Sequence, residues 1–209
     1  MKNTSISTGK MVRLAILVAI ILIMAYTPLG YLKTPTVEIT FIMIPVAITA
    51  IIVGPAGGAI AGTVFGITSF IQCFGASPFG AMLLSINPFF TLIMCIGPRI
   101  LAGWLPGLLY RVLSGTGKKK TLAAISASIA ALVLNTVLFI GTLFLFFGST
   151  DFIKGFGETA WAIIVLLVGV NGLIEAGVGI VIGATVSRAL VHFFPEQPSK
   201  TKEKKMTAE

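Results

Sequence analysis

Residues 121–147 read TLAAISASIAALVLNTVLFIGTLFLFF and include no charged side chain. This run is longer than the roughly 20 apolar residues that an α-helix needs to cross the hydrocarbon layer of a bilayer. An apolar run in a buried core helix of a soluble protein is typically only about 10 to 14 residues long, roughly half the length of this run. The stretch therefore predicts a transmembrane helix, and the rest of the chain is expected to lie around it in a membrane.

The composition of the whole chain supports this interpretation. Of its 209 residues, 56% are hydrophobic and only 11% are charged, whereas soluble globular chains carry roughly 25% charged residues. The mean hydropathy is +1.02. About six spans of roughly 20 residues would use most of the length, which leaves no room for a separate catalytic domain. The sequence predicts a single all-α integral membrane domain in contact with membrane lipid.

Six apolar segments are predicted as transmembrane helices. They cover residues 11–32, 39–53, 56–74, 88–112, 121–147 and 159–191. An even number of spans places both termini on the same side of the membrane. We expect a cytoplasmic tail at residues 1–10, a six-helix membrane domain at residues 11–192, and a charged cytoplasmic tail at residues 193–209.

The lysines and arginines, 15 in all, determine the expected orientation. With both termini in the cytoplasm, the basic residues on the inner side are Lys2, Lys10, Arg13, Arg111, Lys118, Lys119, Lys120, Arg188, Lys200, Lys202, Lys204 and Lys205. Lys33 and Lys154 lie outside, and Arg99 lies within a span. This asymmetry follows the positive-inside rule and predicts a multi-pass protein of the cell membrane. The net charge of +8 therefore reflects topology and does not indicate a nucleic-acid partner.

The third segment carries a small-residue face, since Gly58, Gly62 and Gly66 recur once per helical turn. Such a face allows the backbone of another helix to approach closely. We expect this helix to pack tightly against a neighbour.

The predicted spans contain no residue pattern that indicates an enzyme. They contain no Ser/His/Asp set, no paired carboxylates and no metal-ligand spacing. The single histidine, His192, lies at the cytoplasmic end of the sixth segment. Cys73 and Cys95 are interpreted as small buried hydrophobes. We expect no catalytic residue, no metal and no cofactor.

Ionisable side chains at membrane depth indicate functional sites, because inserting each one costs about 3 kcal/mol. Two occur within the spans, Arg99 and Glu175. With a rise of about 1.5 Å per residue, Arg99, Asn135 and Asn171 lie roughly 16–18 Å below the outer ends of their spans. Glu175 lies one turn beyond Asn171 on the same helix face. The fourth, fifth and sixth spans thus each contribute to one polar layer.

Two interpretations of this layer stay open. In the first, Arg99 and Glu175 neutralise each other and the asparagines bond across helices. In the second, the layer lines a pocket for a small polar ligand, and Arg99 binds a carboxylate or phosphate in bidentate fashion. Further candidates for the outer wall are Tyr31, Gln72 and Asn87. Asn87 also fits an N-cap, because proline follows it at the first helical position.

These features together resemble a known family. The elements that carry the resemblance are Ala15-x-x-x-Ala19 in the first span, Gly54-Pro55 before a glycine-rich third span, and Asn171-Gly-Leu-Ile-Glu175 in the sixth. Over about residues 10–192, the chain resembles the S component, the substrate-binding membrane subunit, of an energy-coupling factor (ECF) vitamin transporter. The resemblance implies capture of a vitamin and delivery with a transmembrane coupling protein and two cytoplasmic ATPases. It also implies docking on the coupling protein through Ala15 and Ala19.

The segments 34–45 and 70–75 are most similar to pantothenate-type members of that family. Arg99 gives this similarity a chemical reason, because pantothenate carries a carboxylate. Riboflavin or another vitamin is the alternative substrate. A self-sufficient small-molecule transporter and a structural membrane subunit are the alternatives from other classes, although a purely structural subunit would not need Arg99.

Overall fold

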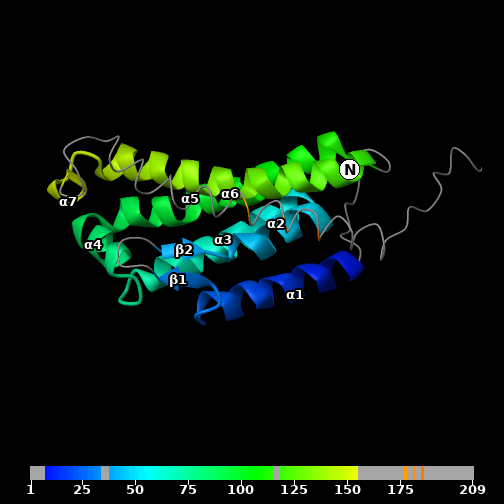
Figure 1. Cartoon of the computed structure of the whole chain (residues 1–209). Helices are drawn as coiled ribbons and strands as arrows, with labels where there is room; N and C mark the ends of the chain where they lie inside the picture. The colour runs from blue at the N-terminus through cyan, green and yellow to red at the C-terminus, as the bar shows by residue number, and fades with distance from the viewer. Residues whose placement is uncertain are drawn as a thin grey trace, which may run out of the picture.

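The computed structural model describes residues 8–33, 38–114 and 118–154, together with Gly177, Val181 and Thr185. Its helices lie side by side in an elongated bundle (Figure 1). The longer helices are α1 (Thr8–Ala25), α2 (Met43–Ile52), α3 (Pro55–Gln72), α5 (Pro88–Leu113) and α6 (Lys118–Phe147). The shorter elements are the helices α4 (Pro78–Ile86) and α7 (Asp151–Lys154) and the strands β1 (Tyr31–Lys33) and β2 (Glu38–Thr40). α5 packs against both α3 and α6, and α2 contacts α1, α3, α5 and α6.

Three of the described helices are long and apolar enough to cross a membrane. They are α1, α5 and the part of α6 from Lys119 to Phe147. α2 is also apolar but has only 10 residues. These helices agree with the predicted class of helical membrane protein. The predicted sixth span, residues 159–191, lies outside the described residues except at three positions, so the six spans and the cytoplasmic termini stay predictions.

The link between α1 and α2 differs from the prediction. One helix was expected over residues 11–32, but α1 ends at Ala25. Beyond it, β1 and β2 pair as an antiparallel hairpin in which Tyr31 lies opposite Thr40. The prediction of one helix over residues 11–32 is wrong, because two strands of three residues are too short to show a reliable alternation in the sequence. The hairpin also delays the start of α2 to Met43.

Helices α3 and α5 pack backbone against backbone. A Cβ atom added to Gly58 would overlap the carbonyl oxygen of Gly103, and one added to Gly62 would overlap the carbonyl oxygen of Arg99. At Gly66, the added atom would lie 2.8 Å from Cα of Ile96. The predicted small-residue face is therefore confirmed. Its partner is the stretch of α5 that contains Arg99, so these glycines fix the position of that residue against α3.

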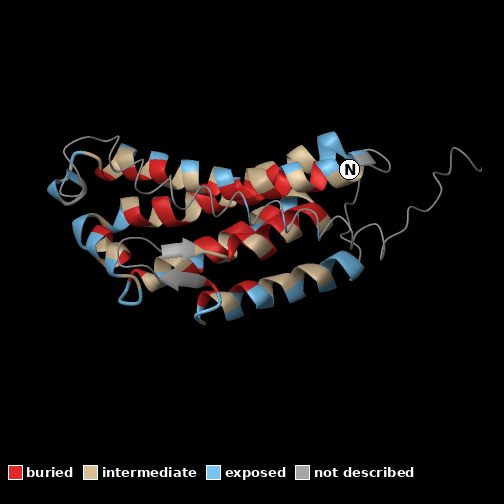
Figure 2. Cartoon of the chain, viewed as in Figure 1, coloured by how far each residue is buried: buried red, intermediate tan, exposed pale blue. Residues whose placement is uncertain are grey.

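The buried residues lie mainly on the parts of the helices that face the interior of the bundle (Figure 2). The main cluster joins α1, α2, α3, α5 and α6, with Ile21, Met43, Val46, Phe65, Ala102, Ala131 and Leu132 among its members. Along α1, only Ile21 and Ala25 are buried. Met24 packs against the cluster, while Met11, Val12, Ile16, Ile20, Leu22 and Ile23 are exposed. α1 therefore has a broad apolar surface available to lipid or to a partner.

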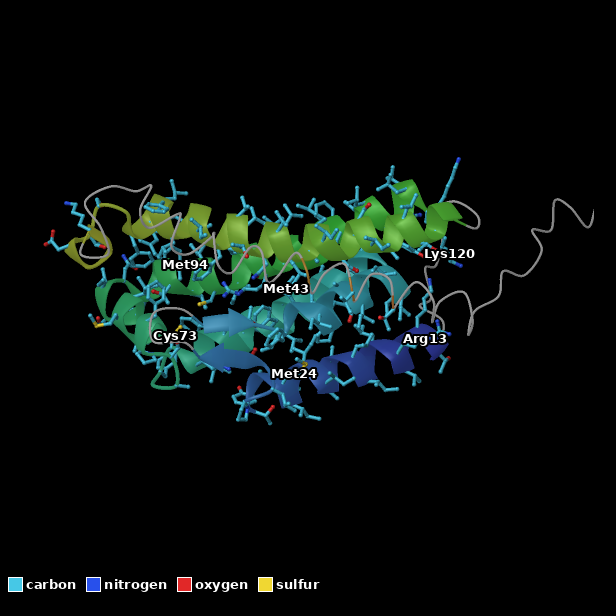
Figure 3. All side chains as sticks on the ribbon, viewed as in Figure 1. Arg13, Met24, Met43, Cys73, Met94 and Lys120 are labelled. Carbon is cyan, nitrogen blue, oxygen red and sulfur yellow. The ribbon has the colours of Figure 1, made fainter. Side chains whose placement is uncertain are left out.

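The described basic side chains gather mainly at one end of the bundle. Figure 3 labels Arg13 and Lys120 near that end, and Cys73 near the other. α7, which carries Lys154, lies at the end opposite Lys120 (Figure 1). Nζ of Lys154 is 3.9 Å from a carboxylate oxygen of Asp151. This distribution matches the charge asymmetry on which the predicted orientation rests.

Candidate ligand-binding site

The sequence of α5 explains how the Arg99 side chain is held. Pro98 has no N–H, so the helix cannot complete the hydrogen bond that normally ends on the carbonyl oxygen of Met94. Nη1 of Arg99 donates to that oxygen at 2.9 Å. Arg99 is only 7% exposed, and a buried guanidinium needs acceptors. The proline thus leaves a carbonyl acceptor available at the position where the arginine uses it.

Two phenylalanines from neighbouring helices contact the same guanidinium. The Cζ atom of Arg99 lies 5.3 Å from the ring centroid of Phe65 on α3 and 4.8 Å from that of Phe139 on α6. Both distances are within the range of a cation–π interaction. Phe65 lies directly before Gly66, in the segment where α3 touches α5. Three helices therefore position one positive charge.

Asn135 lies one helical turn before Phe139 on the same face of α6. It is 5% exposed, and its Oδ1 atom accepts no hydrogen bond from the residues that the structure describes. A buried acceptor without a donor costs about 1–3 kcal/mol. Phe139, one turn beyond Asn135, contacts the guanidinium of Arg99. The polar layer that would join Asn135 to Arg99 stays a prediction.

The side chains of Gln72 and Asn87 form hydrogen bonds with backbone groups at helix ends. Nε2 of Gln72 donates to the carbonyl oxygen of Ala25 at 2.5 Å, which ties the end of α3 to the end of α1. Oδ1 of Asn87 accepts from the backbone N–H of Phe90 at 3.1 Å. Asn87 is therefore the N-cap of α5, as its position before proline indicated. Neither residue contacts Arg99 through these bonds.

The remaining candidates of the polar layer are described only in part or not at all. Tyr31 opens strand β1, but its side chain is not among those described. Asn171 and Glu175 lie outside the described residues. The pairing of Arg99 with Glu175 therefore stays a prediction.

Sequence reasoning missed Phe65, Phe139 and the carbonyl of Met94. Two spacings in the sequence point to them. Pro98 follows Met94 by four residues, which marks a carbonyl released from the helix. Phe139 follows Asn135 by four residues, which places it on the same helix face. Phe65 had no comparable signal, because its contact depends on how α3 packs against α5.

The predicted docking residues Ala15 and Ala19 are both exposed on α1. Large exposed apolar side chains surround them, among which Ile16 is 56% and Ile23 is 59% exposed. A helix face that docks on another membrane protein must be accessible in this way, and small side chains allow close approach of the backbones.

Within residues 8–33, 38–114 and 118–154, no three His, Cys, Asp or Glu side chains come close enough to hold a metal ion. The described part of the candidate site consists of a guanidinium, an amide, a backbone carbonyl and aromatic rings. These groups recognise anions and hydroxyl groups through charge and hydrogen bonds.

Comparison with known proteins extends this description. A family model described as "ECF transporter, substrate-specific component" matches residues 9–187. The match includes nearly all described residues and the positions of Asn171 and Glu175. The pantothenic acid transporter PanT of Lactococcus lactis subsp. cremoris (strain MG1363) is 32% identical over 167 residues, which cover 74% of this chain and 78% of PanT.

Proposed function

Because this chain belongs to the substrate-specific components of ECF transporters, we propose that it captures pantothenate and presents it for import. The observation that carries this proposal is the buried Arg99, which α3, α5 and α6 hold in one orientation. The similarity to a relative named as a pantothenic acid transporter supports the choice of vitamin.

Pantothenate is a small anion with one carboxylate, two hydroxyl groups and one amide. A guanidinium has five N–H donors, so the bond to Met94 uses one and a bidentate carboxylate uses two more. The rings of Phe65 and Phe139 keep water from the guanidinium. In such an environment of low dielectric constant, the attraction between guanidinium and carboxylate is stronger than in water.

The other residues of the polar layer complete the proposed site. Oδ1 of Asn135 accepts a hydrogen bond from a ligand hydroxyl or amide. In this proposal, Asn171 and Glu175 line the pocket from the sixth span, where Glu175 accepts from ligand hydroxyls or balances the charge of Arg99. Tyr31, Gln72 and Asn87 lie toward the outer entrance of the pocket.

The proposed transport cycle requires partners. The chain acts as a binding subunit and not as an enzyme, and a transmembrane coupling protein with two cytoplasmic ATPases supplies the energy. Ala15 and Ala19 on the exposed face of α1 dock on the coupling protein. Six spans with cytoplasmic termini place the polar layer in the outward half of the bundle, where it meets the vitamin outside the cell membrane.

The test is calorimetric titration of the detergent-purified chain with pantothenate, pantothenol and riboflavin. Pantothenol replaces the carboxylate with an alcohol, so it should bind much more weakly than pantothenate if Arg99 binds the carboxylate. Arg99→Ala should weaken pantothenate binding at least tenfold, or about 1.4 kcal/mol. Arg111→Ala, an exposed arginine on the same helix, should leave the affinity unchanged.

The proposal would be wrong if riboflavin bound in place of pantothenate, or if pantothenate and pantothenol bound equally well. An unchanged affinity in a folded Arg99→Ala variant would remove this residue from the site.

A further inference from the structure

The only two cysteines of the chain lie in contact with each other. Cys73 is the C-cap of α3 and Cys95 lies within α5, and their Sγ atoms are 3.8 Å apart. They are 4% and 2% exposed, respectively, and no disulfide joins them. Figure 3 shows Cys73 toward the end of the bundle opposite Arg13 and Lys120. The proposed binding site uses neither sulfur.

The two cysteines are 22 positions apart in the sequence, and their sulfurs meet across the contact between α3 and α5. The interpretation of the cysteines as separate small hydrophobes does not require them to meet. A role that needs both sulfurs accounts for the contact directly.

The packing around the pair also brings three helices together. The thiol of Cys73 donates to the carbonyl oxygen of Ser69 at 3.3 Å. A Cβ atom added to Gly80 of α4 would lie 2.6 Å from Sγ of Cys73. α4 therefore rests directly on this sulfur, while the other sulfur belongs to α5. A covalent bond between the sulfurs would fasten the end of α3 to α5 beneath α4.

We propose that Cys73 and Cys95 are a disulfide-forming pair that reversibly staples α3 to α5. A disulfide bond is about 2.05 Å long, so the sulfurs need to approach by less than ~2 Å. Rotation of the two side chains about their Cα–Cβ bonds can supply such a movement.

The oxidant in the proposed reaction is a small aliphatic disulfide, such as oxidised glutathione. One cysteine thiolate attacks a sulfur of that disulfide, which forms a mixed disulfide and releases one small thiol. The second thiolate then attacks the protein sulfur of the mixed disulfide. The bond between Cys73 and Cys95 forms, a second small thiol leaves, and the two cysteine protons end on the released thiols. The protein loses two electrons and the small disulfide gains them.

The staple should preserve the candidate binding site. Cys95 is next to Met94, whose carbonyl holds Arg99, and the sulfurs already touch while that hydrogen bond is present. The bond should also raise thermal stability, because a link between Cys73 and Cys95 lowers the conformational entropy of the unfolded chain. The oxidised chain should therefore melt at a higher temperature and bind pantothenate with an affinity within about twofold of the reduced chain.

The experiment treats the full detergent-purified chain with oxidised glutathione, then denatures it and labels it with a maleimide. Formation of the staple should abolish labelling of both cysteines, lower the intact mass by about 2 Da, leave the protein monomeric on a non-reducing gel and raise its melting temperature. Dithiothreitol should reverse each change. The single variants Cys73→Ala and Cys95→Ala should keep one thiol that is labelled or carries one glutathione.

Two glutathione adducts on one chain, cross-linked dimers, or full labelling of both cysteines after oxidation would overturn the proposal. A change in pantothenate affinity greater than about threefold on oxidation would show that the bond distorts the site, and this would overturn the proposed staple geometry. The mass and labelling results do not depend on the identity of the vitamin. They therefore remain decisive if the proposed function fails.

Discussion

Where α3 meets α5, the two backbones touch at glycines and Arg99 is 7% exposed. On α1, by contrast, Ile21 and Ala25 are the only buried residues, and Ala15 and Ala19 face outward. In lipid there is no hydrophobic driving force between helices, so close packing and hydrogen bonds must hold them together. The contact between α3 and α5 has such packing along its length, whereas α1 is attached mainly near its end.

In the proposed function, the two regions have different tasks: the contact between α3 and α5 binds the ligand and α1 docks on the partner. A site that recognises a small anion needs donors fixed within a fraction of an ångström, which the packed contact between α3 and α5 can supply. A surface that exchanges lipid for a protein partner needs accessible, small side chains, which α1 has. Changes in the two regions should therefore affect binding and transport differently.

The largest effect is expected from Gly62→Val. A side chain at this position would overlap the carbonyl oxygen of Arg99, so α3 would have to move away from α5 and the guanidinium would shift. We expect pantothenate affinity to fall at least 100-fold, or about 2.8 kcal/mol, with a lower melting temperature. Calorimetric titration and thermal unfolding of the purified variant measure both changes.

Gly141→Ala is the matched control for this substitution. A Cβ atom added to Gly141 of α6 meets no other atom within 4 Å, so affinity and melting temperature should stay as in the wild type. If Gly62→Val bound pantothenate as well as this control, close packing of α3 and α5 would not be what positions Arg99.

The second prediction concerns the exposed face of α1. In the double variant Ala15→Trp with Ala19→Trp, two indoles would prevent close approach of a partner helix. We expect uptake of labelled pantothenate by cells to fall at least tenfold and co-purification with the ATPases to be lost. Binding to the isolated subunit should stay within about twofold, since both residues are exposed. Intact transport with an intact complex would show that α1 docks through another face.

The sequence predicted the features that depend on composition and on helical spacing. The apolar runs predicted the long helices α1, α5 and α6, and the spacing of Gly58, Gly62 and Gly66 predicted a close helix contact. The hairpin after α1 was missed, since its strands are too short to show a pattern. Which helix packs against the glycine face could not be predicted either, because that choice depends on contacts between distant segments.

The smallest effect is expected for a variant that removes the contact between Phe139 and Arg99, which the sequence did not reveal. Phe139→Leu keeps an apolar side chain of similar size but removes the aromatic face 4.8 Å from Cζ of Arg99. A partly desolvated cation–π contact is worth about 1 kcal/mol, so pantothenate affinity should fall about fivefold.

The neutral pantothenol separates a role in positioning Arg99 from a role in packing. Phe139→Leu should reduce the preference for pantothenate over pantothenol, because a less restrained guanidinium binds the carboxylate less well, whereas Phe139→Tyr should restore that preference. Phe144→Leu, which alters another partly buried phenylalanine of α6, should leave it unchanged. An equal loss of affinity for both ligands in Phe139→Leu would mean that the ring only fills space. The buried site would then depend on the contact between α3 and α5, without an electrostatic contribution from α6.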